Sequence, residues 1–134
     1  VNGKLYQLKG SSAQLVTDPD ATGTDYDTFT ISGIAVTSAI NLAGTAYAHS
    51  NTFSVTSGDI IKVAVYVTNN SGAAPTVEIC QSGGLAISNV EQLVNGLNIV
   101  TLTATDTQTA HLTFRNAVAA NFALSNIYCF KDPN

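Results

Sequence analysis

Hydrophobic and polar residues alternate along most of this chain, with the period of two that is typical of β-strands. In the segment SGDIIKVAVYVTNNSG, residues 57–72, an isoleucine and three valines occupy the odd positions from 61 to 67, and Lys, Ala, Tyr and Thr occupy the even positions between and after them. Similar patterns predict strands over residues 4–8, 13–17, 27–36, 46–55, 59–68, 76–81, 85–90, 97–105, 110–116 and 122–130. The alternation also predicts that Val63, Val65, Leu112, Phe114 and Leu124 are buried.

Clusters of Gly, Asn, Ser and Asp interrupt these segments about every ten residues, which is the spacing of turns in all-β proteins. The Ser71-Gly72 and Asn95-Gly96 pairs supply residues that tolerate the positive φ of tight hairpins. Helical periodicity is confined to residues 89–96, a stretch so short that we interpret it as a turn or short strand. The pattern therefore predicts one all-β domain over residues 1–134, an antiparallel sandwich or barrel.

Charged residues make up only 10% of the chain, well below the usual ~25%. The polar surface is built instead from Thr, Ser, Asn and Gly, a composition typical of extracellular or virion-exposed β proteins. The net charge is −4 and Arg115 is the sole arginine, so the clustered cations that a phosphate backbone requires are missing. No apolar run approaches the ~18–20 residues that span a bilayer. We therefore expect neither nucleic-acid binding nor insertion into a membrane.

Four segments follow one another in a familiar order: SGDIIKVAVYVTNNSG, GLNIVTLTAT, AHLTFRN and NFALSNIYCFK. A Ser-Gly-Asp turn leads into a long strand, and the last strand carries a Phe-x-Leu-x-Asn-Ile pattern. Over residues 29–131 this order resembles the jelly-roll carbohydrate-binding modules of the galactose-binding-like type. Such modules occur beside polysaccharide-degrading enzymes and in bacteriophage tail and fibre proteins.

The resemblance implies a jelly-roll β-sandwich and a non-catalytic glycan-binding function at an extracellular or virion surface. Two features depart from the family pattern. Many of these modules hold sugar rings with exposed Trp, and this chain has none; the last strand carries Asn126 where the family often has Asp. A structural surface module that binds no sugar is the alternative function, and a small hydrolase is the third. The domain would work as a homo-oligomer or attached to a larger protein.

The residues opposite the predicted core positions form the candidate ligand site. They combine an aromatic ring with cations, an imidazole and a carboxylate, the groups that stack on a sugar ring and bond directionally to its hydroxyls. The candidate residues are Lys62, Tyr66, Glu78, His111 and Arg115. They form one site only if their strands are neighbours in one sheet. The alternative is an ordinary polar face with a cross-strand ion pair between Glu78 and Arg115 or Lys62.

No cofactor is required by this function, but the acidic loop DPDATGTDYD offers a structural calcium site. Its oxygen donors would be Asp18, Asp20, Asp25 and Asp27. The alternative is a solvated turn in which these side chains accept hydrogen bonds from backbone N–H groups.

Catalytic signals are weak, so we expect no enzymatic activity. The two glutamates, Glu78 and Glu91, lie on separate elements, whereas a glycosidase needs two carboxyl groups facing one bond. Neither a Gly-x-Ser-x-Gly nor a His-Glu-x-x-His motif is present. Cys80 and Cys129 are too few for a disulfide framework and are interpreted either as two half-buried thiols or as one bridge.

Overall fold

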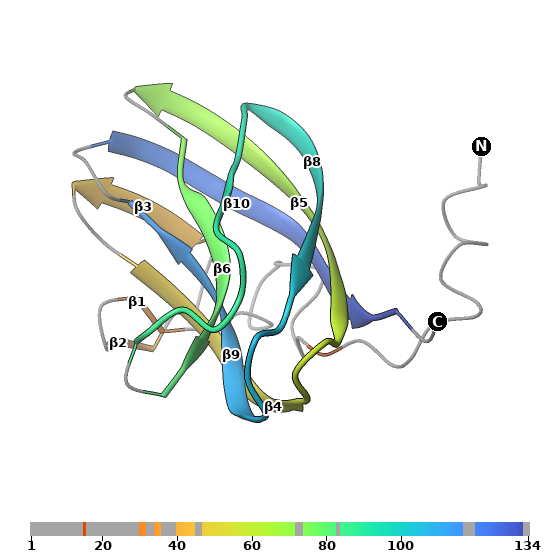
Figure 1. Ribbon diagram of the computed structural model, residues 1–134. Coiled ribbons are helices and arrows are strands. Elements are labelled where there is room, and N and C mark those ends of the chain that lie inside the picture. The colour runs from red at the N-terminus through yellow and green to blue at the C-terminus, as the bar shows by residue number, and fades with distance from the viewer. Residues whose placement is uncertain are drawn as a thin grey trace.

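The computed structural model describes residues 15, 30–31, 34–35, 40–44, 47–71, 74–82, 84–116 and 120–132, and the side chains of 15, 47–68, 74–82, 84–116 and 123–132. Within these residues all regular structure is β-strand, and no helix is long and apolar enough to cross a membrane. The strands form two antiparallel sheets that face each other (Figure 1). The predicted jelly-roll β-sandwich is confirmed; the candidate calcium ligands Asp18, Asp20, Asp25 and Asp27 lie outside the described residues.

The larger sheet has six strands in the order β2-β1-β4-β9-β6-β7. Its strands are β1 (Thr30–Ile31), β2 (Ile34–Ala35), β4 (Tyr47–Val55), β6 (Thr76–Gln81), β7 (Glu91–Gln92) and β9 (Gln108–Arg115). The smaller sheet has four strands in the order β3-β10-β5-β8. They are β3 (Ile40–Gly44), β5 (Ile60–Ser71), β8 (Gly96–Thr103) and β10 (Ala120–Lys131). Apart from β1 and β2, which are separated by two residues, neighbouring strands are not consecutive in the sequence or are joined by longer connections, as in a jelly roll.

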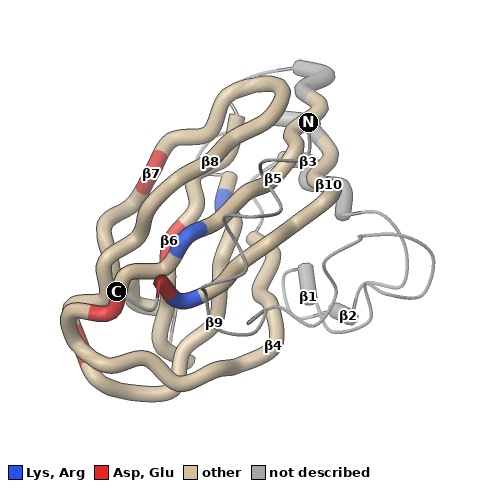
Figure 2. The backbone as a smooth tube through the Cα atoms, turned by 90° about the vertical axis from the view of Figure 1, so that its right-hand side faces the viewer, with Lys and Arg blue, Asp and Glu red and all other residues tan. Residues whose placement is uncertain are grey.

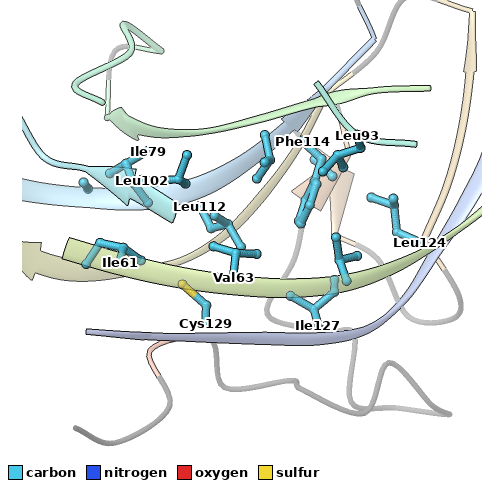
Figure 3. Packing of buried hydrophobic residues seen from close by; sticks show 14 of the residues in the cluster. Ile61, Val63, Ile79, Leu93, Leu102, Leu112, Phe114, Leu124, Ile127 and Cys129 are labelled. Atoms are coloured by element: carbon cyan, nitrogen blue, oxygen red, sulfur yellow. The ribbon is translucent and has the colours of Figure 1, made fainter. Parts of the chain in front are cut away.

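The core fills the space between the sheets, where inward side chains of β4, β6 and β9 meet those of β5, β8 and β10 (Figure 3). Phe114 is its largest fully buried side chain. The five residues predicted to be buried are at most 1% exposed: Val63, Val65, Leu112, Phe114 and Leu124. Alternation therefore identified the inward face of β5, β9 and β10 correctly.

The segment 85–90, predicted as a strand, makes only isolated bridges, and that prediction is wrong. Ala86 pairs with Cys80 of the larger sheet, whereas Ser88 pairs with Ala104, directly after β8 of the smaller sheet. A segment that passes from one sheet to the other cannot keep a ladder with either. The interpretation of 89–96 holds, because this segment contains the short strand β7 and a bend at Asn95, after which Gly96, with a φ of +100°, begins β8.

Strand β10 contains an irregularity at Asn126, which adopts a positive φ of 52°. The pairing register with β5 shifts between Ser125 and Tyr128, so the extra residues form a bulge. Asn is among the few residues with a side chain that adopt this backbone conformation readily. Asn126 stands where the carbohydrate-binding modules that this chain resembles often have Asp, and in this chain it forms the bulge of β10.

Candidate functional site

The outer face of the larger sheet gathers polar and aromatic side chains from its three central strands. Tyr47 and His49 point outward from β4, because Ala48 between them is fully buried. On β9 the outward positions are His111, Thr113 and Arg115. On β6 they are Glu78 and Cys80, which alternate with the core residues Val77 and Ile79 and are themselves only 4% and 0% exposed. The pairing registers place these positions beside one another across β4, β9 and β6.

The structure divides the five predicted site residues between the two outer faces of the sandwich. Glu78, His111 and Arg115 lie together on the larger sheet, whereas Lys62 and Tyr66 lie on β5 of the smaller sheet. The core separates the two groups, so one site made of all five residues is wrong. Alternation indicates which side chains point outward, but it does not say which sheet a strand joins.

An ion pair anchors one side of the larger sheet's outer face. The Nη2 atom of Arg115 lies 3.4 Å from Oε2 of Glu78 and donates to the carbonyl oxygen of Gly84 at 3.3 Å. The two residues are diagonal neighbours, since Glu78 pairs directly with Thr113. Burial lowers the pKa of Arg115, but the Glu78 carboxylate and the Cys80 side chain together outweigh burial, so this pKa is raised overall. The ion pair expected for an ordinary polar face is therefore present, and it fixes the guanidinium in place.

Cys80 extends this ion-pair cluster. Its thiol donates to Oε2 of Glu78 at 2.9 Å, and Nη2 of Arg115 lies 3.7 Å from its Sγ atom. Burial, together with the hydrogen bond to Glu78, raises the pKa of Cys80 to about 11. The thiol is thus protonated at neutral pH and is a poor nucleophile. Cys80 and Cys129 form no disulfide, which confirms the two-thiol interpretation, but both are fully buried and not half-buried as expected. Cys129 lies in the core between the sheets.

Three rings form a row on the other side of the face. The Tyr47 and His49 rings are 4.5 Å apart between centroids, and the His49 and His111 rings are stacked at 4.4 Å with an interplanar angle of 16°. Nδ1 of His49 and Oγ1 of Thr113 are 2.8 Å apart. Cζ of Arg115 lies 5.9 Å from the Tyr47 ring centroid, which joins the ring row to the ion-pair cluster.

The two imidazoles are uncharged at neutral pH. Burial lowers the pKa of His49 to about 4, with further lowering by His111 and Arg115 against an opposing effect of Glu78. Burial also lowers the pKa of His111, although a hydrogen bond with the Gln81 backbone acts in the other direction. The face therefore carries one cation and one anion that neutralise each other, beside rings with polar edges.

The sequence reasoning did not place Tyr47, His49 or Cys80 in the ligand site. The signal for the first two was the alternation in YAHS, where a ring residue stands at every second position. What the sequence lacked was the pairing of β4 with β9, which brings His49 opposite Thr113 and close to His111. Within the described residues, no three His, Cys, Asp or Glu side chains come together as metal ligands.

The outer face of the smaller sheet is different in character. Tyr66, Leu97, Ile99 and Tyr128 are exposed by 45, 64, 74 and 38%, respectively. Tyr66 pairs with Leu97, and Ala64 lies between Ile99 and Tyr128 in the register, so these side chains form one apolar patch. The sequences of β3 and β8 contain no charged residue. β5 and β10 carry one lysine each (Figure 2). Lys62 donates to Oγ1 of Thr101 at 2.9 Å, at one side of this patch.

No protein-family model and no curated protein sequence matches this chain. Solved structures do match it. The N-terminal cellulose-binding domain of Cellulomonas fimi β-1,4-glucanase C has a TM-score of 0.58 and 15% identity, over 92% of this chain and 99% of that domain. A variant of the carbohydrate-binding module CBM29-2 has a TM-score of 0.54 and 12% identity, over 89% and 91% of the respective chains.

A third similar structure is the enzymatically active domain of tailspike protein 4 from bacteriophage CBA120, with a TM-score of 0.57 and 10% identity. The match covers 88% of this chain but only 21% of the tailspike chain. At these identities the similarity concerns the fold. The chain thus folds as a jelly-roll β-sandwich similar to that of carbohydrate-binding modules.

Proposed function

We propose that this domain is a non-catalytic glycan-binding module and that its site is the outer face of β4, β9 and β6. The observation that carries the proposal is the joining of the Tyr47–His49–His111 ring row to the Arg115–Glu78 ion pair on one sheet face. Rings and fixed hydrogen-bonding groups side by side are the elements that sugar recognition needs. The carbohydrate-binding modules with a similar fold support the same function.

Each group has a distinct role in this proposal. Arg115 uses only Nη2 for the contacts described above, so its other donors are available to sugar hydroxyls. The ion pair to Glu78 holds the guanidinium in one orientation, which reduces the entropy lost on binding. Tyr47 supplies an apolar ring and a hydroxyl. Because the charges of the face cancel, the ligand class that fits best is a neutral glycan.

A shallow site of this size binds weakly, with a dissociation constant on the order of 0.1–1 mM, or about 4–5.5 kcal/mol. Useful adhesion would come from several copies that act together. This suits a tail fibre, an adhesin or a secreted polysaccharide-degrading enzyme. The extracellular or virion-surface location belongs to the proposal, and its support is the hydroxyl-rich, weakly charged composition and the tailspike similarity.

Replacement of Tyr47 tests the position of the site. The purified domain is titrated by calorimetry with neutral hexasaccharides, cellohexaose and mannohexaose, and with an acidic oligogalacturonide, each up to about 5 mM. We expect a neutral probe to bind and Tyr47→Ala to weaken it by about tenfold, equal to ~1.4 kcal/mol, because the ring contact is lost.

Tyr66→Ala is the matched control, since Tyr66 is an exposed tyrosine on the opposite face. It should leave the affinity unchanged. If Tyr66→Ala weakens binding and Tyr47→Ala does not, the site is on the smaller sheet and includes Lys62 and Tyr66. If no probe binds at 5 mM to the wild type, the glycan-binding proposal fails.

The apolar patch on the smaller sheet favours the second candidate function, that of a structural module that assembles through this face. Large exposed apolar patches mark interaction sites.

If this function holds, the domain self-associates, and Ile99→Lys at the centre of the patch prevents the self-association. Sedimentation equilibrium measures both. Leu85→Lys is the control, because Leu85 is as exposed as Leu97 (64%) but lies outside this sheet. A monomeric wild type at about 1 mM excludes assembly of the domain by itself.

A structural calcium ion bound by Asp18, Asp20, Asp25 and Asp27 remains a prediction from the sequence. The glycan site proposed here needs no metal or cofactor.

A further inference from the structure

The chain contains two histidines, and the fold stacks one on the other. His49 comes from β4 and His111 from β9, so their contact exists only when these strands pair. All imidazole titration of the protein is therefore concentrated at one point on the face proposed to bind glycan.

The geometry of the stacked pair disfavours protonation of His111. Its Nε2 atom is buried and has no hydrogen-bond partner among the residues that the structure describes. Protonation there would create a buried, charged N–H group without an acceptor, which is among the most costly arrangements in a folded protein. The proton can be accommodated only if the ring moves outward to water, and this movement breaks the stack with His49.

The groups around the pair do not compensate a new positive charge. On β4 the neighbour is Tyr47, which is neutral; on β9 it is Arg115, a cation. On β6 the neighbours are Cys80, whose thiol is protonated, and Glu78. Glu78 is the one group here that attracts a proton to His49, but its Oε2 atom already contacts Arg115 and accepts a bond from Cys80.

We propose that the His49–His111 stack is an acid-triggered release device, in which proton uptake separates the two rings and disrupts the glycan face. The inference rests on the proposed function for its biological effect, since the ring row is part of that site. The ring separation itself is a property of the ligand-free protein.

The direction of the effect follows from proton linkage. The pKa of both rings is lowered from the ordinary value of 6.5 in the closed structure, to about 4 for His49. An imidazole that has moved into water regains an ordinary pKa, so the open form binds more protons than the closed form between pH 6.5 and 4. Lowering the pH through this window favours the open form, and above pH 6.5 the preference disappears. Binding should therefore be constant at neutral pH and decline in acid.

The test uses the ligand-free domain labelled with ¹³C and ¹⁵N. Two imidazole signals are expected, and both should titrate with midpoints below 6.5. Nuclear Overhauser contacts between the His49 and His111 rings should be present at pH 7.5 and lost as the signals titrate. Contacts that persist unchanged through the titration, or midpoints at or above 6.5, would overturn the inference.

A variant with His49→Phe and His111→Phe distinguishes a pH effect of the imidazoles from a pH effect of the carboxylates. Phenyl rings preserve stacking but take up no proton, so the ring contacts of the variant should persist down to pH 4. If the wild type binds cellohexaose or mannohexaose at pH 7.5, its affinity should fall at least about fivefold by pH 4.5, and the variant should lose this dependence on pH. An equal fall in both proteins overturns the inference without affecting the proposed function. Absence of glycan binding at pH 7.5 defeats the proposed function, while the ligand-free titration still decides whether the stack opens.

Discussion

Phe114→Ala is expected to lower the free energy of unfolding by about 3–5 kcal/mol. Phe114 is fully buried in β9 and projects between the two sheets (Figure 3). Its strand neighbours in the register are Ala48 on β4 and Val77 on β6, and both are also fully buried. Removal of the ring leaves a cavity that these small side chains cannot fill. Urea denaturation followed by circular dichroism measures the loss.

Phe53→Ala is the control for this experiment, because Phe53 packs against the core from a partly exposed position on β4. Its expected cost is about half as large, since less apolar area is removed from contact and the site opens to solvent. Equal losses for the two variants, or a loss below about 1 kcal/mol for Phe114→Ala, would contradict the assignment of the inward face of β9.

Arg115→Ala is expected to cost about 2–3 kcal/mol, the second-largest effect. The Glu78 side chain is only 6% exposed, and removal of Arg115 leaves its carboxylate buried with the Cys80 thiol as its remaining described partner. Loss of one partner from a fully buried ion pair costs 3–5 kcal/mol, and the 36% exposure of the Arg115 side chain reduces this. Glu78→Gln should cost less, because the guanidinium left behind reaches water.

The double variant Glu78→Gln with Arg115→Ala provides the sharper test. It should be more stable than Arg115→Ala alone, since the uncompensated carboxylate is gone. Lys131→Ala is the matched control at a second ion pair, in which Nζ of Lys131 lies 2.7 Å from Oδ2 of Asp59. Although this distance is shorter, Asp59 is 21% exposed, and we expect a cost of about 1 kcal/mol or less. A double variant less stable than Arg115→Ala would show that burial of Glu78 is not what makes the pair important.

The consequences for binding are separate from those for stability. Arg115→Ala removes hydrogen-bond donors from the proposed glycan face, whereas Phe114→Ala acts on the opposite side of the same strand. Adjacent residues of β9 thus have different roles: Phe114 packs in the core of the sandwich, and Arg115 contributes to the proposed glycan-binding face. This division follows from the alternation of side chains along a strand.

The sequence by itself determined the fold class and the inward residues of the main strands. Both depend on local information, because side chains on a strand alternate with a fixed period and turns need particular residues. This is why Val63, Leu112 and Phe114 could be assigned to the core before any strand was paired. The same reasoning failed at 85–90, where the hydrophobic pattern is present but the segment passes between sheets.

Only the tertiary structure decided which outward residues share a face. Lys62 and Tyr66 point away from the core, as Glu78 and Arg115 do. They lie on opposite outer faces, however, because β5 joins one sheet and β6 and β9 join the other. The His49–His111 stack likewise depends on the pairing of β4 with β9. Strand pairing is set by contacts between residues far apart in the sequence, which compete across many registers and are resolved by packing of the whole core. A strand's own alternation carries no information about its neighbour, and so the composition of the site was fixed by the fold.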